Sequence, residues 1–205
     1  ALQWGCLFPT QVRAVLATCC TARCYPHNRV FLEGVKAALT CDHAFENGRY
    51  RTPPERGLRA FGRVYAGWVY SQAFFRHELW REQGFGSIEE LLRFWEQDHL
   101  GQDANDLLTV LNTWQNGDIS DNPVFGMDFD AALSAIAMPT RMMPCTTDLY
   151  FTREDASEDG IRMPGATVES LESDWGHVAG GAGREAASHN RILAAARALL
   201  SGKAS

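Results

Sequence analysis

The sequence has no excess of basic residues and no long hydrophobic run. Its 19 Lys and Arg residues stand against 25 Asp and Glu residues, so the formal net charge of −6 provides no positive field to attract nucleic acid or anionic lipid. The longest apolar runs, such as 12–20, fall well short of the roughly 20 residues that a membrane helix needs. The first residues carry no positive charge of the kind that opens a targeting signal. We therefore expect a cytoplasmic protein, with no nucleic acid and no membrane among its partners.

The six cysteines do not form a recognisable framework. A chain of 205 residues with 45% hydrophobic residues can bury a core without disulfides, so we expect free thiols. Four of the cysteines lie near two histidines in the sequence: Cys19, Cys20, Cys24, Cys41, His27 and His43. Their spacing matches no zinc-ligand pattern, and the simpler interpretation is that they are small buried hydrophobic residues. We expect no metal and no bound cofactor.

Short apolar segments alternate with segments of helical periodicity outside the middle of the chain. The strands are predicted over 11–20, 140–145 and 167–173, and the helices over 1–7, 130–136 and 185–200, with one more helix between the second and third strands. The first strand is rich in β-branched residues and continuously apolar, which is typical of a buried parallel strand. Strands that alternate with helices favour the α/β class, with a parallel sheet of about three strands.

The middle of the chain, residues 25–120, shows only helical periodicity. Helices are predicted over 30–39, over about 55–80, from Ser87 onward and over 104–115. Ser87 and Glu90 form a capping box, and we expect Asp103 and Asn105 to cap the last helix. We therefore predict a helical cap over 25–120, inserted into a core made of 1–24 and 121–205. We expect the following side chains to be largely buried: Trp68, Trp80, Trp95 and Trp114.

The aromatic residues of this cap have two interpretations. They could line an apolar pocket for an acyl or alcohol group, or they could form the core of the helical region. The core is favoured, because aromatic residues at helical spacing more often pack inside. The residues concerned are Tyr65, Trp68, Tyr70, Phe74 and Trp80.

Two titratable side chains follow the ends of the second and third predicted strands. Asp148 comes shortly after residue 145, and His177 comes shortly after residue 171. Open α/β sheets bind ligands beyond the carboxyl ends of their strands, so we expect His177 Nδ1 within hydrogen-bonding reach of Asp148. A carboxylate that orients a histidine base serves nucleophilic catalysis. A turn-forming Asp and an ordinary exposed His are the alternative interpretations.

Four motifs, in this order, resemble the C-terminal part of the homoserine O-acetyltransferase-like branch of the α/β-hydrolases. They are Ala-Leu-Gln-Trp at 1–4, Asp-Ala-Asn at 103–105, Thr-Asp-Leu-Tyr-Phe at 147–151 and Asp-Trp-Gly-His at 174–177. The resemblance covers nearly the whole chain. It implies an α/β-hydrolase C-terminal portion with an inserted cap, in which Asp148 is the triad acid and His177 the triad base.

The resemblance also implies a serine nucleophile, and no Gly-x-Ser-x-Gly elbow occurs in the sequence. Cys6 follows Gly5 inside the first predicted helix, so we interpret it as a packing residue. We therefore expect the acid/base half of a serine acyltransferase or esterase, inactive until a missing N-terminal segment or a partner chain supplies the serine. The missing initiator Met suggests processing or an excised piece. Its substrates would be a small-molecule acyl donor, such as an acyl-CoA, and an acyl acceptor.

The binding partners follow from the same reasoning. The strand at 12–20 would leave one apolar edge unpaired, so we expect a heterodimer with an N-terminal companion chain, or self-association. Val178 stands where true homoserine acetyltransferases usually carry an acidic residue, which argues against homoserine as acceptor. The alternative function is a binding or assembly module that lacks a nucleophile and catalyses nothing.

Overall fold

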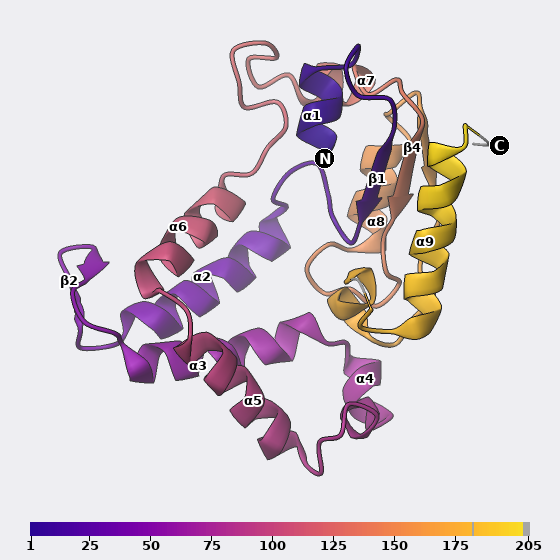
Figure 1. Cartoon of the computed structure of the whole chain (residues 1–205). Coiled ribbons are helices and arrows are strands. Elements are labelled where there is room, and N and C mark those ends of the chain that lie inside the picture. Colours follow the sequence, from indigo (N-terminus) through magenta and orange to yellow (C-terminus); the bar gives the residue numbers. More distant parts are fainter. Residues whose placement is uncertain (182, 203–205) are drawn as a thin grey trace.

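A parallel sheet lies at one end of the molecule, and a group of helices lies at the other (Figure 1). The computed structural model describes residues 1–181 and 183–202. Its three-stranded sheet has the order β1-β4-β5, with strands β1 (Val15–Thr18), β4 (Thr140–Met143) and β5 (Ala166–Val168). Val15 pairs with Thr140, and Thr140 with Ala166, in parallel register. The predicted α/β class and the three parallel strands are confirmed.

Helices cover both faces of this sheet. They are α1 (Leu2–Leu7), α7 (Phe129–Ser134), α8 (Arg153–Gly160) and α9 (Ala186–Leu200). Val15 and Ala17 point toward α1 and α7, whereas Leu16 points to the opposite face and packs in the cluster that includes Ala195 of α9. This alternation follows from the two-residue period of a strand, and it explains the continuous apolar run in the sequence.

The helical group, called the cap below, lies between β1 and α7 in the chain. Its elements are α2 (Pro26–Thr40), β2 (Phe45–Glu46), β3 (Arg49–Tyr50), α3 (Glu55–Val69), α4 (Gln72–Arg76), η1 (Leu79–Arg81), α5 (Ile88–Leu100) and α6 (Ala104–Gln115). Helix α3 packs against both α2 and α5. The cap core combines aliphatic and aromatic side chains, including Phe31, Leu32, Phe61 and Phe74. The domain boundaries at 25 and 120 stay a prediction.

The prediction of one long helix over about 55–80 is wrong. Helix α3 ends at Val69, because Tyr70 is extended, and Ser71 then caps α4 by accepting a hydrogen bond from the backbone of Phe74. The Ser71 hydroxyl also donates to the carbonyl of Asp174 in the core. A contact with a distant segment therefore sets the break, although the aromatic periodicity continues through it.

The cap also contains a small hairpin that helical periodicity did not predict. Strands β2 and β3 pair as antiparallel neighbours, and Asn47 and Gly48 between them both have positive φ. An Asn-Gly pair of this kind favours a tight hairpin turn. Asn105 does not cap α6 as expected, because its side chain bonds to the backbone N–H and carbonyl of Tyr50. Asp103 alone provides the predicted cap.

Several element boundaries and the burial of several side chains also differ from the predictions. Strands β1 and β5 are shorter than their predicted ranges, and the helix expected between the second and third strands is α8. Trp80 is buried as expected, whereas the other three expected Trp side chains are only half-buried: Trp68, Trp95 and Trp114. Among the described residues, no helix has both the length and the apolar character required to traverse a membrane.

Candidate active site

Asp148 lies in the turn that follows β4. Its carboxylate is fully buried, and its Oδ1 accepts hydrogen bonds from the backbone N–H groups of Tyr150 at 2.8 Å and Phe151 at 3.2 Å. A short polar side chain that bonds to the backbone two residues ahead stabilises a turn of this type. The turn thus fixes one carboxylate oxygen and leaves the other free to face the next loop.

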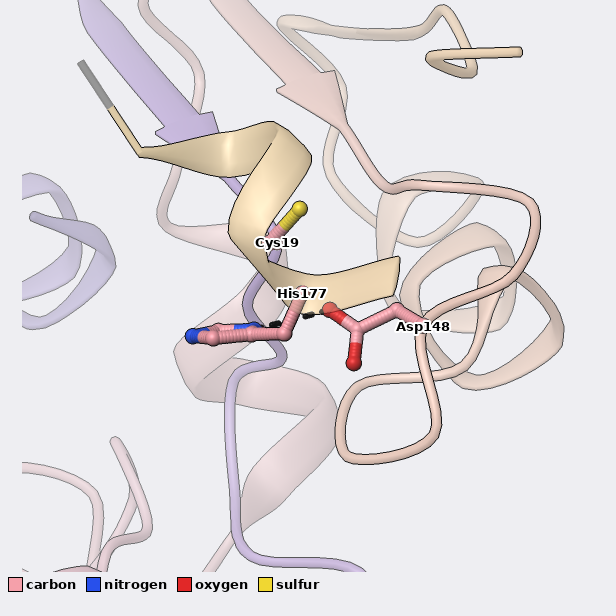
Figure 2. A group of neighbouring side chains, drawn as sticks. All are labelled: Cys19, Asp148 and His177. Atoms are coloured by element: carbon pink, nitrogen blue, oxygen red, sulfur yellow. Dashed lines mark hydrogen bonds and ion pairs between the residues drawn. The ribbon is translucent and has the colours of Figure 1, made fainter. Parts of the chain in front are cut away.

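His177 lies on a short 3₁₀ helix, η2 (Gly176–Gly180), which follows the third strand. Its Nδ1 lies 2.9 Å from Asp148 Oδ2. Because a carboxylate only accepts, Nδ1 carries the proton of this hydrogen bond. Nε2 points away from Asp148, as Figure 2 shows. The expected hydrogen bond is therefore present, and it leaves Nε2 as the nitrogen that can accept a proton.

Backbone and hydroxyl groups hold the two loops together. Thr147 Oγ1 donates to the carbonyl of Ser173 at 2.7 Å and accepts from the backbone N–H of Gly176 at 3.1 Å. Gly176 has a φ of +68°, and a Cβ at this position would lie 2.7 Å from the backbone nitrogen of Ser71. Only glycine suits both the conformation and the close approach of the cap.

Two aromatic rings pack against the His177 ring. Tyr150 meets it edge-on with ring centroids 4.9 Å apart, and Phe151 lies 5.5 Å away. Tyr150 stacks in turn on Phe31 of the cap at 4.7 Å. Burial raises the pKa of Tyr150, so its hydroxyl stays protonated. The rings restrict how the imidazole can tilt.

A cavity of about 810 Å³ opens beside His177, between the cap and the core. Its lining includes Phe61, Tyr65, Tyr70, Trp95 and Trp114 from the cap, and Thr18, His177 and Gly180 from the core. The two interpretations of the aromatic residues therefore both apply in part. Tyr65 and Tyr70 line the cavity, whereas Phe74 and Trp80 are buried in the cap core. A partly apolar cavity next to a histidine is suited to a small organic ligand.

Cys19 is a neighbour of this pair that the sequence interpretation missed. Its Sγ, an oxygen of Asp148 and a ring nitrogen of His177 all lie within 4.8 Å of one another (Figure 2). Its burial was predicted and is confirmed. Burial and the charge of Asp148 raise the pKa of the Cys19 thiol, so it is not an activated nucleophile. Its position directly after a strand end was the signal available in the sequence.

Cys6, the other thiol considered as a nucleophile, lies elsewhere. It is buried in α1, and its thiol donates to the carbonyls of Gln3 and Ile119. Burial raises its pKa as well. Its interpretation as a packing residue agrees with these contacts.

Comparison with known proteins identifies the family. No protein-family model matches the chain. The chain is 30% identical over 179 residues to the "Probable esterase" of Corynebacterium glutamicum, with 86% of this chain and 51% of the relative aligned. It is 31% identical over 179 residues to the ethyl acetate hydrolase of Pseudomonas veronii, with the same coverage. A homoserine O-acetyltransferase of Chlorobaculum tepidum is 26% identical over 188 residues, with 87% and 51% aligned.

Solved structures agree with these relatives. The acetyl esterase MekB superposes with a TM-score of 0.91 at 30% identity, over 98% of this chain and 58% of that one. An acetylester hydrolase from Corynebacterium glutamicum gives 0.85 at 29% identity, over 97% and 56%. The chain corresponds to the C-terminal part of a homoserine O-acetyltransferase-like α/β-hydrolase. This α/β-hydrolase chain spans about half the length of the curated relatives that it matches.

Proposed function

We propose that this chain supplies the acid and the base of a serine esterase or acyltransferase. The 2.9 Å hydrogen bond between His177 Nδ1 and Asp148 Oδ2 carries the proposal, because it leaves Nε2 as a proton acceptor at the edge of the cavity. The esterases and acetyltransferases among its relatives support the same reaction class. In this role Asp148 is the orienting acid and His177 the general base.

The reaction would proceed in two steps. His177 Nε2 takes the proton of the serine hydroxyl as the serine oxygen attacks the ester carbonyl, and then gives that proton to the departing alcohol. Asp148 holds the ring in place and stabilises the imidazolium that forms. In the second step His177 removes a proton from water, in a hydrolase, or from an acceptor alcohol, in a transferase, as that oxygen attacks the acyl carbonyl. The bond between the acyl group and the serine oxygen then breaks, and His177 returns the proton to the serine. With a donor such as an acyl-CoA, the group that departs in the first step is the thiol rather than an alcohol.

The serine would come from an N-terminal segment or from a partner chain. Strand β1 has β4 on one side and no strand on the other among the described residues. Helix α1 packs against β1, and two exposed aromatic side chains lie in it and at its end: Trp4, 63% exposed, and Phe8, 38% exposed. An open strand edge with exposed aromatic side chains nearby favours pairing with another polypeptide, so we propose a heterodimer or, failing that, self-association.

The six free cysteines support a reducing compartment, and we assign the protein to the cytoplasm on that basis.

A mutational experiment tests the proposal. Native protein is purified, its serine is labelled with a fluorophosphonate, and the labelled peptide is sequenced. In material that carries such a serine, His177→Ala should lower kcat for a small acetate ester by about 10⁶ and Asp148→Asn by about 10⁴. His43→Ala is the control, since its side chain is 85% exposed and its loss should leave kcat unchanged.

The other outcomes decide against the proposal. Unchanged activity in His177→Ala would show that another group acts as the base. If no serine-bearing polypeptide is bound and no activity is found, the chain is instead a binding module. Adding an acceptor alcohol to the assay distinguishes acyl transfer from hydrolysis.

A further inference from the structure

Three ligand atoms of different chemistry lie close together at His177. They are Cys19 Sγ, a carboxylate oxygen of Asp148 and a ring nitrogen of His177, all within 4.8 Å of one another. The three residues come from three separate segments: the end of β1, the turn after β4, and η2 (Figure 2). The fold, rather than a local sequence motif, therefore creates this cluster.

The donor set suits a thiophilic divalent cation. Sulfur, imidazole nitrogen and carboxylate oxygen are the ligands of zinc sites, whereas magnesium and calcium prefer oxygen alone. Bonds of roughly 2.0 to 2.3 Å place two tetrahedral ligands roughly 3.3 to 3.8 Å apart. The 2.9 Å between His177 Nδ1 and Asp148 Oδ2 is already shorter than this, so that pair must open slightly. A sulfur and a nitrogen or oxygen ligand of one tetrahedral ion lie roughly 3.5 Å apart, so the sulfur needs to approach by about 1.3 Å at most.

The thiol is held in position, and an ion can reach it. A Cβ on Gly180 would lie 2.6 Å from Cys19 Sγ, so η2 packs directly against the sulfur. Cys19 is 3% exposed and the Asp148 carboxylate is fully buried. The His177 side chain is 30% exposed, and both Cys19 and His177 line the cavity. The cavity thus provides the entry path and room for a water as the fourth ligand.

We propose that Cys19, Asp148 and His177 form a binding site for a thiophilic divalent cation, of the class of Zn²⁺ and Cd²⁺. On binding, the Cys19 S–H proton leaves to solvent as the metal–sulfur bond forms. The proton of His177 Nδ1 moves by way of solvent to Nε2, and the metal occupies Nδ1. The hydrogen bond to Asp148 is replaced by the metal. If the proposed catalytic role of His177 holds, a ring with Nε2 protonated cannot accept the serine proton, and bound metal inhibits the enzyme.

Cadmium is the probe, because its bond to a thiolate has an ultraviolet charge-transfer band. The 205-residue chain is titrated with Cd²⁺ in the absence of substrate. The band should saturate at one ion per chain, and X-ray absorption at the cadmium edge should show one sulfur among nitrogen and oxygen ligands. Mg²⁺ in excess should not displace the ion.

Three variants locate the site. Cys19→Ser should abolish the band, and His177→Ala should weaken Cd²⁺ binding by about tenfold or more, since one ligand of the set is lost. Cys41→Ser is the matched control, because Cys41 is an exposed free cysteine. This variant should bind Cd²⁺ with the affinity of the wild type. Far-ultraviolet circular dichroism checks that each variant is folded. If Cys19→Ser does not fold, the Cd²⁺ affinity of His177→Ala decides whether the site exists.

Opposite results would overturn the proposal. The first is the absence of a saturable Cd²⁺–thiolate band. The second is a band that disappears in Cys41→Ser and persists in Cys19→Ser. The third is an unchanged affinity for Cd²⁺ in His177→Ala. Because binding is measured without substrate, its failure leaves the proposed acyl chemistry intact. Conversely, if the chain binds the metal but shows no catalytic activity, the proposed metal site is supported and the proposed enzymatic function is not.

Discussion

The cap side and the core side of the cavity differ in what fixes their side chains. On the cap side aromatic rings pack on one another, such as Tyr70 on Phe74 at 4.0 Å, and the buried indole N–H of Trp95 has no hydrogen-bond partner in the described part of the chain. On the core side Asp148 accepts from two backbone groups and from His177. Apolar packing tolerates replacement by side chains of similar volume, whereas the hydrogen bonds require particular atoms. We therefore expect the cap side of the cavity to tolerate substitution better than the hydrogen-bonded Asp148 and His177.

Two buried carboxylates sharpen this contrast. Asp42, in the cap, accepts from the backbone N–H groups of Ala44 and Gly57, both at 2.9 Å. Asp159, in α8, accepts from the backbone N–H of Ala22 and the hydroxyl of Tyr25, both at 2.7 Å. Burial raises the pKa of Asp159 above 3.8. Burial also acts on Asp42, but its two backbone donors hold the pKa below 3.8.

The largest effect on stability is expected in the aromatic packing of the cap. Phe31 is 2% exposed and contacts four other rings, so Phe31→Ala should lower the free energy of unfolding by about 3–5 kcal/mol. Val30→Ala is the control, because Val30 is 67% exposed on the same helix and should change it by less than about 0.5 kcal/mol. Urea denaturation measures both. Equal losses would mean that ring packing does not stabilise the cap.

The buried carboxylate of the core should have the next largest effect. Asp159→Ala leaves the buried N–H of Ala22 without an acceptor, so we expect a loss of about 1–3 kcal/mol in the free energy of unfolding. Glu158→Ala, at the exposed neighbouring position, should have almost no effect. A negligible loss in Asp159→Ala would show that the β1 loop does not depend on this contact.

The two carboxylates should respond to pH in opposite directions. Asp42 has a lowered pKa when folded, so its stabilisation is present above the unfolded value near 3.8 and is lost as the pH falls through the folded pKa. Asp159 has a raised pKa, so its contribution is most favourable below 3.8 and is lost as the pH rises through the folded pKa. The difference in unfolding free energy between wild type and Asp42→Asn should therefore grow with pH, and that for Asp159→Asn should shrink. Two parallel curves would contradict the assignment.

The smallest effects are expected at the exposed ion pairs of the two regions. Arg63 links α3 to Glu89 and Glu96 in the cap, and Arg191 of α9 lies 2.9 Å from Glu169 in the core. Arg63→Ala and Arg191→Ala should each cost under about 1 kcal/mol, and less in high salt. A larger, salt-independent loss at either site would mean that the guanidinium contributes through packing rather than charge.

The sequence was most informative where local pattern and topology agree. Val15 and Met142 lie in apolar runs that could be recognised as buried strands, and the carboxyl-end rule then brought Asp148 and His177 together. Helix α8 was expected only as an element between the second and third strands, and its bounds could not be predicted. Its sequence is mostly polar and only its inner turn is buried, at Ala156, Asp159 and Gly160, so periodicity gives no signal for where it begins and ends.

Contacts between distant segments account for the other failures. The break at Tyr70 depends on a hydrogen bond from Ser71 to Asp174, 103 residues away. The position of Cys19 beside Asp148 and His177 depends on η2, whose Gly180 carbonyl accepts from Thr18 across 162 residues. No window of sequence contains both partners of either contact, so tertiary packing decides them.

The separation between β1 and β4 has a consequence for how the chain folds. The whole cap lies between these paired strands, and closing so long a loop carries an entropic cost before the pairing contributes anything. Helices α2 and α5, in contrast, pack on α3, which is the next helix after α2 in the sequence. We therefore expect the molecule to assemble from its middle outward, with the strands joining late. Because Asp148 and His177 are brought together only by the completed sheet, a partly folded chain cannot form the hydrogen bond between them.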